Sequence, residues 1–250
     1  MKNVLITNLF FEKYTGSELH VLEIARLFEE KGFEVTIAVF QKAYPLMAEA
    51  GSIRIVECQS EELGDTDFDV LFVQHFPVFD YICCKYNIQY KYLIVSKLSV
   101  FMDVEQLPIC TNDADMIWCI SQECADCVKK SLGLDNRIRI LKNCASDDFF
   151  EKYNINYNKR YHLKRIAVIS NHVPEEIIEL KELMKNEYEI EFIGMEYNPY
   201  HVTAELLGEY DLIITIGRTV QACFAAGVPV YVYDYFGGPG YIDSSNFELA

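Results

Sequence analysis

The chain has 250 residues, of which 51% are hydrophobic, and it carries a formal net charge of −16 at pH 7. This length accommodates one large domain or two small ones, each with its own core. The negative charge argues against nonspecific nucleic-acid binding, which requires clustered Lys and Arg side chains. It still allows a local site for a small anion, built from backbone N–H groups and a single arginine.

The sequence has no apolar run of the roughly 18 to 20 residues that a membrane-spanning helix needs. A strand pattern begins almost at once, without a basic and apolar leader, so we expect no signal peptide. The nine cysteines lie mostly in apolar runs, which is typical of reduced thiols in the cytoplasm. Cys124 and Cys127 have zinc-ligand spacing, but the elements predicted around them lack the turns of a zinc ribbon. We therefore expect a cytoplasmic protein without a metal site.

Strand and helix patterns alternate through the first part of the chain. Asn3 to Phe10 is predicted as a strand, and the helix predicted from Glu18 to Lys31 presents an apolar stripe to the sheet. Ser17 is predicted to cap this helix, and Phe33 to Phe40 completes a right-handed βαβ unit. Further strands are predicted at 53–58, 69–74, 92–96, 116–121 and 138–142, with helices at 45–50, 78–86 and 122–132. Together these elements predict a complete doubly wound sheet.

A polar and irregular stretch from Asp147 to Lys164 interrupts this alternation. We place the domain boundary there, with a first domain at 1–150, a linker at 151–164 and a second domain at 165–250. Strands at 165–170, 189–194, 212–216 and 228–233 then alternate with helices at 174–185, 202–210 and 218–226. The predicted fold class is α/β, with two Rossmann-like doubly wound domains of which the second is incomplete.

The segment from Tyr210 to Tyr241 predicts where a ligand binds. Leu212 to Ile216 is an apolar run typical of a parallel strand buried on both faces. Asp234 and the predicted loop Gly237-Gly238-Pro239-Gly240 follow the last strand of this segment. Ligands of open α/β sheets bind at the carboxyl ends of the strands, and glycines let backbone N–H groups approach a ligand closely. This edge of the second domain is therefore a predicted binding site.

Several segments resemble one protein family in their order and spacing. Thr15-Gly16-Ser17-Glu18 is similar to its Gly-Gly-x-Glu loop, and Asp115 to Ser121 looks like its strand that ends in a serine. Ile138 to Asn143 resembles the strand and turn that close its first domain. Ala222 to Val230 resembles its helix and Gly-x-Pro-Val strand. The family is the large retaining glycosyltransferase family 4, or group 1, whose members have the two-domain GT-B fold.

The resemblance implies a hexosyltransferase that moves a sugar from a nucleotide-sugar donor to a glycan or lipid-linked acceptor in cell-envelope biosynthesis. The first domain is expected to hold the acceptor and the second the donor. The resemblance implies no cofactor and no metal, because helix dipoles and basic side chains stabilise the leaving diphosphate in this fold. Peripheral association with a membrane stays open, as does the oligomeric state.

The candidate site residues follow predicted strands or begin predicted helices. His75 is the catalytic candidate, as a base or a sugar-binding group, and a structural histidine is the alternative. Arg218 is the candidate partner of the donor diphosphate, and a solvated arginine in a first helical turn is the alternative. The other predicted substrate-binding residues are Gly16, Ser17, Asn171, His172, Thr219, Asp234, Gly237, Gly238 and Gly240. Ordinary turns and caps would explain several of these equally well.

The sequence also departs from the family. The family carries a pair of glutamates for the donor sugar and ribose, and the matching positions here are Ile214 and Ala222. The family's Arg and Lys for the diphosphate are absent from the matching loop, Ser170 to Glu175, and its second domain continues for several more elements. These departures keep two alternatives open: a degenerate or truncated glycosyltransferase-like binding protein, and a nucleotide-sugar epimerase, which shares the two-domain scaffold.

Overall fold

The computed structural model describes residues 2–133, 136–151, 162–194, 197, 200–235 and 237–247. The chain divides into two compact units, Met1–Lys142 and Asn143–Ala250, which are described separately below. The division falls before the predicted boundary at residue 150, because Phe149 packs against a core cluster of the second unit. Most of the predicted linker lies outside the described residues.

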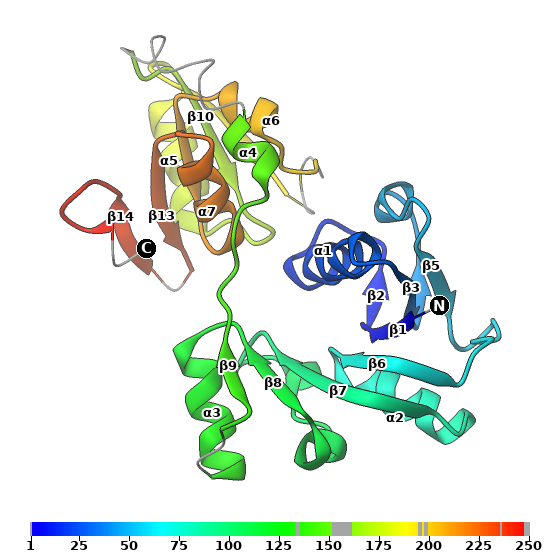
Figure 1. The fold of residues 1–250 in the computed structure, drawn as a ribbon. Helices are drawn as coiled ribbons and strands as arrows, with labels where there is room; N and C mark the ends of the chain where they lie inside the picture. The colour runs from blue at the N-terminus through cyan, green and yellow to red at the C-terminus, as the bar shows by residue number, and fades with distance from the viewer. Residues whose placement is uncertain are drawn as a thin grey trace. The chain divides into compact units, whose positions relative to one another are not determined.

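The first unit is built on a sheet whose described strands follow the order β5-β3-β1-β6-β7-β8-β9, with every pairing parallel (Figure 1). Its strands are β1 (Lys2–Thr7), β3 (Phe33–Val39), β5 (Arg54–Glu57), β6 (Asp67–Val73), β7 (Gln89–Lys97), β8 (Met116–Cys119) and β9 (Ile138–Ile140). Two short strands, β2 (Phe10–Phe11) and β4 (Gln41–Lys42), form a separate parallel pair. The strands predicted in this half are confirmed.

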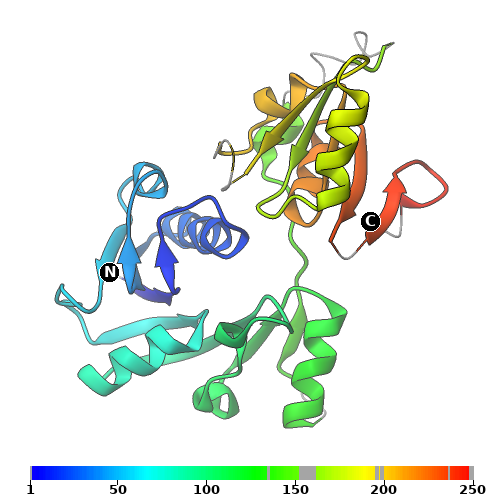
Figure 2. The same ribbon diagram turned by 180° about the vertical axis from the view of Figure 1, so that it is seen from behind.

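Helices cover the two faces of this sheet unevenly. The chain leaves β1 toward β3 through α1 (Gly16–Glu30), and it leaves β6 and β8 toward the opposite edge through α2 (Phe76–Lys85) and α3 (Gln122–Leu132). Right-handed crossovers that run in opposite directions place their helices on opposite faces. Figure 1 shows α1 on one side of these strands and α2 and α3 on the other, and Figure 2 shows the same arrangement from behind. The short helices η1 (Leu46–Glu49), η2 (Asp103–Glu105) and η3 (Ile109–Asp113) lie in connections.

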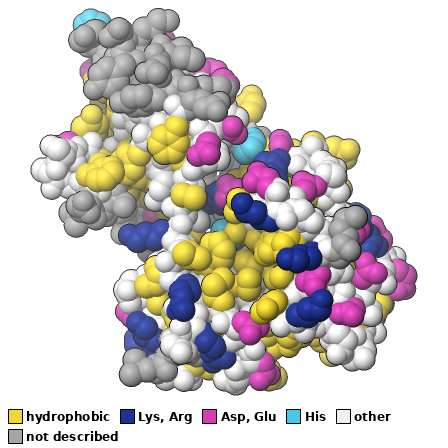
Figure 3. All heavy atoms as spheres, viewed as in Figure 1, with side chains coloured by type: hydrophobic (Ala, Val, Ile, Leu, Met, Phe, Trp, Pro, Cys, Tyr) yellow, Lys and Arg dark blue, Asp and Glu magenta, His cyan; other side chains and the backbone are white. Residues whose placement is uncertain are grey.

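Two apolar clusters reflect this division. On one face α1 packs against β1, β3 and β5, and this cluster reaches Phe72, Ile94 and Trp118 on the strands beyond β1. On the other face α2 and α3 pack against residues such as Leu71 and Ile117. Beyond β6, the α1 side of the sheet is exposed in part: Tyr92 of β7 is 60% exposed. Figure 3 shows an apolar patch on the side seen in Figure 1.

The second unit has a sheet of described order β11-β10-β12-β13-β14. Its strands are β10 (Arg165–Ile169), β11 (Glu189–Ile193), β12 (Leu212–Thr215), β13 (Val230–Asp234) and β14 (Gly237–Tyr241). Its helices are α4 (Asp147–Glu151), α5 (Glu175–Met184), α6 (Ala204–Gly208) and α7 (Arg218–Ala225). Apolar clusters pack on both faces of this sheet. This confirms that the apolar run at 212–216 is a strand buried on both faces.

The prediction of a glycine loop after β13 is wrong. Residues Gly237 to Tyr241 form strand β14, which pairs antiparallel with β13. Gly237 and Gly240 have positive φ angles of 81°, and a Cβ at Gly238 would lie 2.1 Å from the carbonyl oxygen of Val232. Glycine is therefore required here for the tight hairpin itself. Among the described residues, no helix is long and apolar enough to cross a membrane.

We expect Gly238→Ala to destabilise the chain by about 1–3 kcal/mol, because the new methyl group overlaps the backbone of β13 and the hairpin must open. Urea unfolding followed by circular dichroism measures this. Gly16→Ala is the matched control, because nothing lies within 4 Å of its Cβ position. Equal stability of both variants and the parent chain would contradict the hairpin geometry.

Candidate functional site

The first unit changes direction at the carboxyl ends of β1 and β6. The chain runs from β1 to β3 on one side and continues at β6 on the other, which makes this the topological switch point of the sheet. Buried polar residues gather here from several elements: Thr7, Asn8, Glu18, His20, Gln74, His75, Ser96, Lys97 and Glu105. Most buried polar groups in folded proteins have hydrogen-bond partners, and the hydrogen bonds within this group define the site.

Gln74 is the centre of this network and is fully buried. Its amide nitrogen donates to Asn8 Oδ1 and to the carbonyl oxygen of Ser17, each at 2.9 Å. Its amide oxygen lies 2.8 Å from His20 Nδ1, so that nitrogen carries the proton. Its backbone N–H and carbonyl both bond the hydroxyl of Thr7. One side chain therefore joins the ends of β1 and β6 to the first turns of α1.

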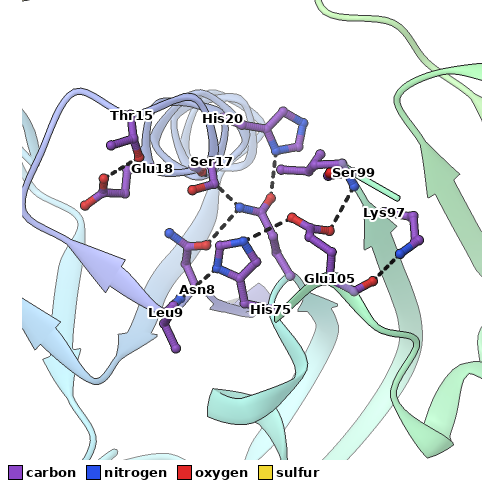
Figure 4. Close-up of polar contacts among 12 residues, drawn as sticks. Asn8, Leu9, Thr15, Ser17, Glu18, His20, His75, Lys97, Ser99 and Glu105 are labelled. Carbon is purple, nitrogen blue, oxygen red and sulfur yellow. Dashed lines mark hydrogen bonds and ion pairs between the residues drawn. The ribbon is translucent and has the colours of Figure 1, made fainter. Parts of the chain in front are cut away.

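His75 lies where the sequence predicted it, directly after β6 at the carboxyl edge. The backbone N–H of Leu9 donates to His75 Nδ1 at 3.1 Å, and His75 Nε2 lies 3.1 Å from Glu105 Oε1 (Figure 4). Because Nδ1 accepts a hydrogen bond, Nε2 carries the ring N–H and donates a hydrogen bond to the carboxylate. His75 is 8% exposed, and both nitrogens are engaged by the protein. This geometry favours the structural interpretation, and a catalytic role for His75 stays a prediction.

The backbone at His75 has φ 58° and ψ 95°, the only positive φ of a non-glycine residue in the described chain. A non-glycine residue takes up this conformation only when its surroundings hold it there. Glu105 supplies that hold from η2: its other carboxylate oxygen accepts the N–H of Leu98 at 2.9 Å, and its carbonyl accepts a bond from Lys97. The loop after β7 thus fixes the loop after β6.

Glu18 organises the loop that leads into α1. Its carboxylate accepts hydrogen bonds from the N–H groups of Glu12 and Lys13 at 2.7 and 3.0 Å. It also accepts a hydrogen bond from the hydroxyl of Thr15 (Figure 4). Thr15 occupies the N-cap position and α1 begins at Gly16, so the predicted capping role of Ser17 is wrong. Thr15 and Glu18 have the spacing of a capping box, but the Thr15 hydroxyl bonds the Glu18 carboxylate and caps no backbone N–H of the helix. Gly16 is exposed and Ser17 is half-buried at the first turn.

The second unit has its own switch point between β10 and β12, since β11 and β13 lie on opposite sides of this pair. Thr215 at the end of β12 donates its hydroxyl proton to the carbonyl of Ile169, 2.7 Å away at the end of β10. In the loop after β10, the Ser170 hydroxyl bonds both the N–H and the carbonyl of His172. Two loops are thereby held at one edge of the sheet.

These two loops carry four of the predicted site residues. Asn171 is half-buried and His172 exposed in the loop after β10, while Arg218 and Thr219 are half-buried in the first turn of α7. Gly217 precedes Arg218 with φ 62°, a left-handed turn that starts the helix at the edge. Asn171, His172, Arg218 and Thr219 thus share the switch point, as predicted from strand ends.

The remaining candidates lie one strand further along. Asp234 ends β13 and is 9% exposed, next to β12 in the sheet. Gly237, Gly238 and Gly240 belong to β14 at the edge of the sheet, beyond β13 from the switch point. Their place in a strand pairing explains the glycines without a ligand, and their role in binding stays a prediction.

The two positions expected to hold glutamates are core positions. Ile214 of β12 is 5% exposed and packs in one apolar cluster of the second unit, and Ala222 of α7 is 6% exposed in the other. A carboxylate at either position would be buried in apolar surroundings at a large cost. Among the described residues, no group of three or more His, Cys, Asp or Glu has the arrangement of a metal site.

Several solved structures are similar to the chain over nearly its whole length. An alpha-glucosyltransferase in complex with UDP and a 13-mer DNA matches with a TM-score of 0.59 and 12% identity, over 92% of this chain and 79% of that chain. A sucrose-phosphate synthase from Thermosynechococcus elongatus matches with a TM-score of 0.57 and 10% identity, over 92% and 81%. These neighbours are GT-B glycosyltransferases. The chain has the GT-B fold.

A third GT-B neighbour is the lipopolysaccharide outer core galactosyltransferase WaaB, with a TM-score of 0.56 and 12% identity, over 92% of this chain and 80% of that chain. No protein-family model and no curated protein matches the sequence. Identities this low establish the fold alone, and the three neighbours are a glucosyltransferase, a sucrose-phosphate synthase and a galactosyltransferase. The predicted GT-B architecture is therefore confirmed, and substrates remain to be argued from the site.

We expect Glu18→Ala to lower the free energy of unfolding by about 1–3 kcal/mol, because two backbone N–H groups of the loop lose their acceptor. Urea unfolding measures the change. Glu30→Ala, at an exposed position of the same helix, is the matched control and is expected to be within ±0.5 kcal/mol of the parent chain. A neutral Glu18→Ala would show that the loop does not depend on this carboxylate.

Proposed function

We propose that the protein is a glycosyltransferase that uses a nucleotide-sugar donor. The observation that carries the proposal is the second unit's switch point, where the first turn of α7 and the loop after β10 meet within a GT-B fold. The α7 N-terminus presents backbone N–H groups and the positive end of its dipole, which favour a phosphate. Arg218 adds a guanidinium that bonds a diphosphate in a bidentate manner.

The first unit is proposed to hold the acceptor, a glycan or a lipid-linked sugar. Its switch point is rigid, since Gln74, His75 and Glu105 have their polar groups satisfied within the protein. Such a network suits a scaffold that positions a substrate hydroxyl. No cofactor is needed in this proposal, because the donor's diphosphate is the leaving group and helix dipoles stabilise it. A role in cell-envelope biosynthesis and a cytoplasmic location remain predictions, as does the absence of a nucleic-acid partner.

A second candidate is a GT-B protein that binds a nucleotide or a glycan without transferring a sugar. The burial of Ile214 and Ala222 in the core favours it, because the carboxylates expected for the donor sugar and ribose have no place at these positions. Titration with nucleotides followed by a turnover assay separates the two. Binding with turnover of any nucleotide sugar supports the enzyme, whereas binding without turnover supports the second candidate.

We expect UDP or GDP to bind the chain and Arg218→Ala to weaken this binding roughly 10- to 100-fold, the equivalent of a charge-assisted hydrogen-bond pair. Isothermal titration calorimetry gives both dissociation constants. Lys185→Ala, which removes an exposed positive charge after α5, is the matched control and should leave the affinity unchanged. Failure of both diphosphates to bind the parent chain would contradict the proposed donor site.

A further inference from the structure

On the face of the first unit's sheet that carries α1, side chains of β7, β8 and β9 form two rows, which we call the array. Parallel register pairs Ser96 of β7 with Trp118 of β8, and Trp118 with Arg139 of β9. Two residues closer to the amino ends of the strands, and so on the same face, Ile94 pairs with Met116. Paired residues of neighbouring strands point to the same face. A polar row therefore lies at the carboxyl edge, and an apolar row lies directly behind it.

This part of the face is accessible. Tyr92 lies behind Ile94 on the same strand and is 60% exposed, and Leu141, which follows β9, is 42% exposed. Met116 and Trp118 are half-buried. Figure 3 shows the corresponding apolar patch with Lys and Arg side chains around its border. A contiguous apolar patch with a charged border marks a binding surface.

The buried hydroxyl of Ser96 indicates a ligand that has hydroxyl groups. It is 6% exposed, and within the described part of the chain its hydroxyl has no hydrogen-bond partner. A buried hydroxyl without a partner costs stability and is rare in folded proteins. Val73 of β6 pairs with Val95 of β7, so the residues that follow them, Gln74 and Ser96, lie beside each other at the edge of the polar network. The array thus offers an unused hydrogen-bonding group next to the proposed acceptor site.

Trp118 is held as a fixed aromatic surface. Its indole nitrogen donates to the carbonyl of Leu141 at 2.9 Å, and the rings of His20 and Phe72 meet it edge-on, with centroids 5.5 and 5.9 Å away. A ring fixed in this way offers a large contact area with little loss of conformational entropy on binding. His20 also bonds Gln74, so the aromatic surface and the polar network are directly connected.

Arg139 adds positive charge to the same row. It is exposed and next to Trp118 in the register, on a chain whose net charge is −16. Its guanidinium donates to the carbonyl of Ile138 at 2.9 Å, which holds it at the edge of the sheet. A guanidinium beside an apolar surface suits an anionic head joined to a hydrocarbon, because each part of such a ligand meets its complement.

We propose that this face binds the acceptor as an anionic glycolipid. The hydrocarbon lies over Tyr92, Ile94 and Met116, the phosphate or other anionic link lies at Arg139, and the sugar lies against Trp118 at the carboxyl edge. A sugar hydroxyl bonds Ser96 once the neighbouring side chains shift to admit it. The role of this ligand as the acceptor rests on the proposed glycosyl transfer, whereas its binding to the face does not depend on turnover.

Trp118 is the single tryptophan of the chain, so its fluorescence reports on this site alone. The probes are decyl phosphate, octyl glucoside and glucose, each titrated below micelle-forming concentrations. We expect both amphiphiles to change the Trp118 emission saturably, decyl phosphate to bind more tightly, and glucose to have no measurable effect. No saturable change with either amphiphile overturns the proposal, and so does equal binding of glucose, which has no hydrocarbon.

Three variants locate the ligand's parts. Tyr92→Ser is expected to weaken both amphiphiles roughly tenfold, because the hydrocarbon loses apolar contact. Arg139→Gln is expected to weaken decyl phosphate alone by a similar factor. Tyr44→Ser is the matched control, since Tyr44 is an exposed tyrosine (81%) outside the array. Equal effects of Tyr92→Ser and Tyr44→Ser overturn the proposal, as they would indicate nonspecific detergent binding.

Ser96→Ala distinguishes a ligand-binding hydroxyl from a structural one. Because the hydroxyl has no partner in the described chain, the variant is expected to unfold at the same temperature as the parent chain or a higher one. Its affinity for octyl glucoside is expected to fall several-fold, while that for decyl phosphate stays unchanged. Unchanged affinity for octyl glucoside overturns the placement of the sugar at Ser96.

The titration with nucleotide diphosphates separates this inference from the proposed function. A chain that binds UDP or GDP but neither amphiphile keeps the proposed transferase and loses the acceptor surface. A chain that binds the amphiphiles but no nucleotide keeps the surface as a glycolipid-binding site and loses the transferase.

Discussion

The requirement that buried polar groups find partners organises the first unit. Gln74 has no contact with solvent, and each of its amide groups is bonded to a group from the end of β1 or the start of α1. Losing any of these partners would leave a buried polar atom unpaired, at a cost of about 1–3 kcal/mol. The loops at the switch point are therefore held by one another, and His75 keeps an unusual backbone conformation because Leu9 and Glu105 bond both sides of its ring.

The handedness of the crossovers decides which surfaces remain for ligands. Right-handed connections to opposite edges of the sheet put α1 on one face and α2 and α3 on the other. The α1 face beyond β6 therefore receives no helix from these connections, and its side chains form the array around Trp118. In the second unit the same rule brings the loops after β10 and β12 together. Both surfaces are consequences of topology before any particular side chain is considered.

Glycines and apolar residues limit what the second unit can do. Gly238 is required because β14 packs against the backbone of Val232, and Ile214 with Ala222 fill the core. These residues serve the sheet, so Arg218 and the N-terminus of α7 carry the proposed interaction with the donor. A site built from a helix N-terminus and one guanidinium binds a diphosphate through charge and backbone N–H groups. This explains how a chain without the glutamate pair retains a candidate donor site.

The sequence by itself determined the two series of alternating strands and helices that carry the candidate residues, because apolar periodicity and glycines reflect how each segment is buried. The GT-B architecture followed from the resemblance of several segments to a known family. The sequence also placed Asn171, His172, Arg218 and Thr219 at strand ends and helix starts. Only the tertiary structure decided that Glu105 holds His75 in place, since the two are brought together by the loop after β7 and no pattern relates them. It likewise decided that Gly237 to Tyr241 pair with β13, and that Ser96, Trp118 and Arg139 form one row. Strand register sets such neighbours, and register depends on the packing of the whole sheet.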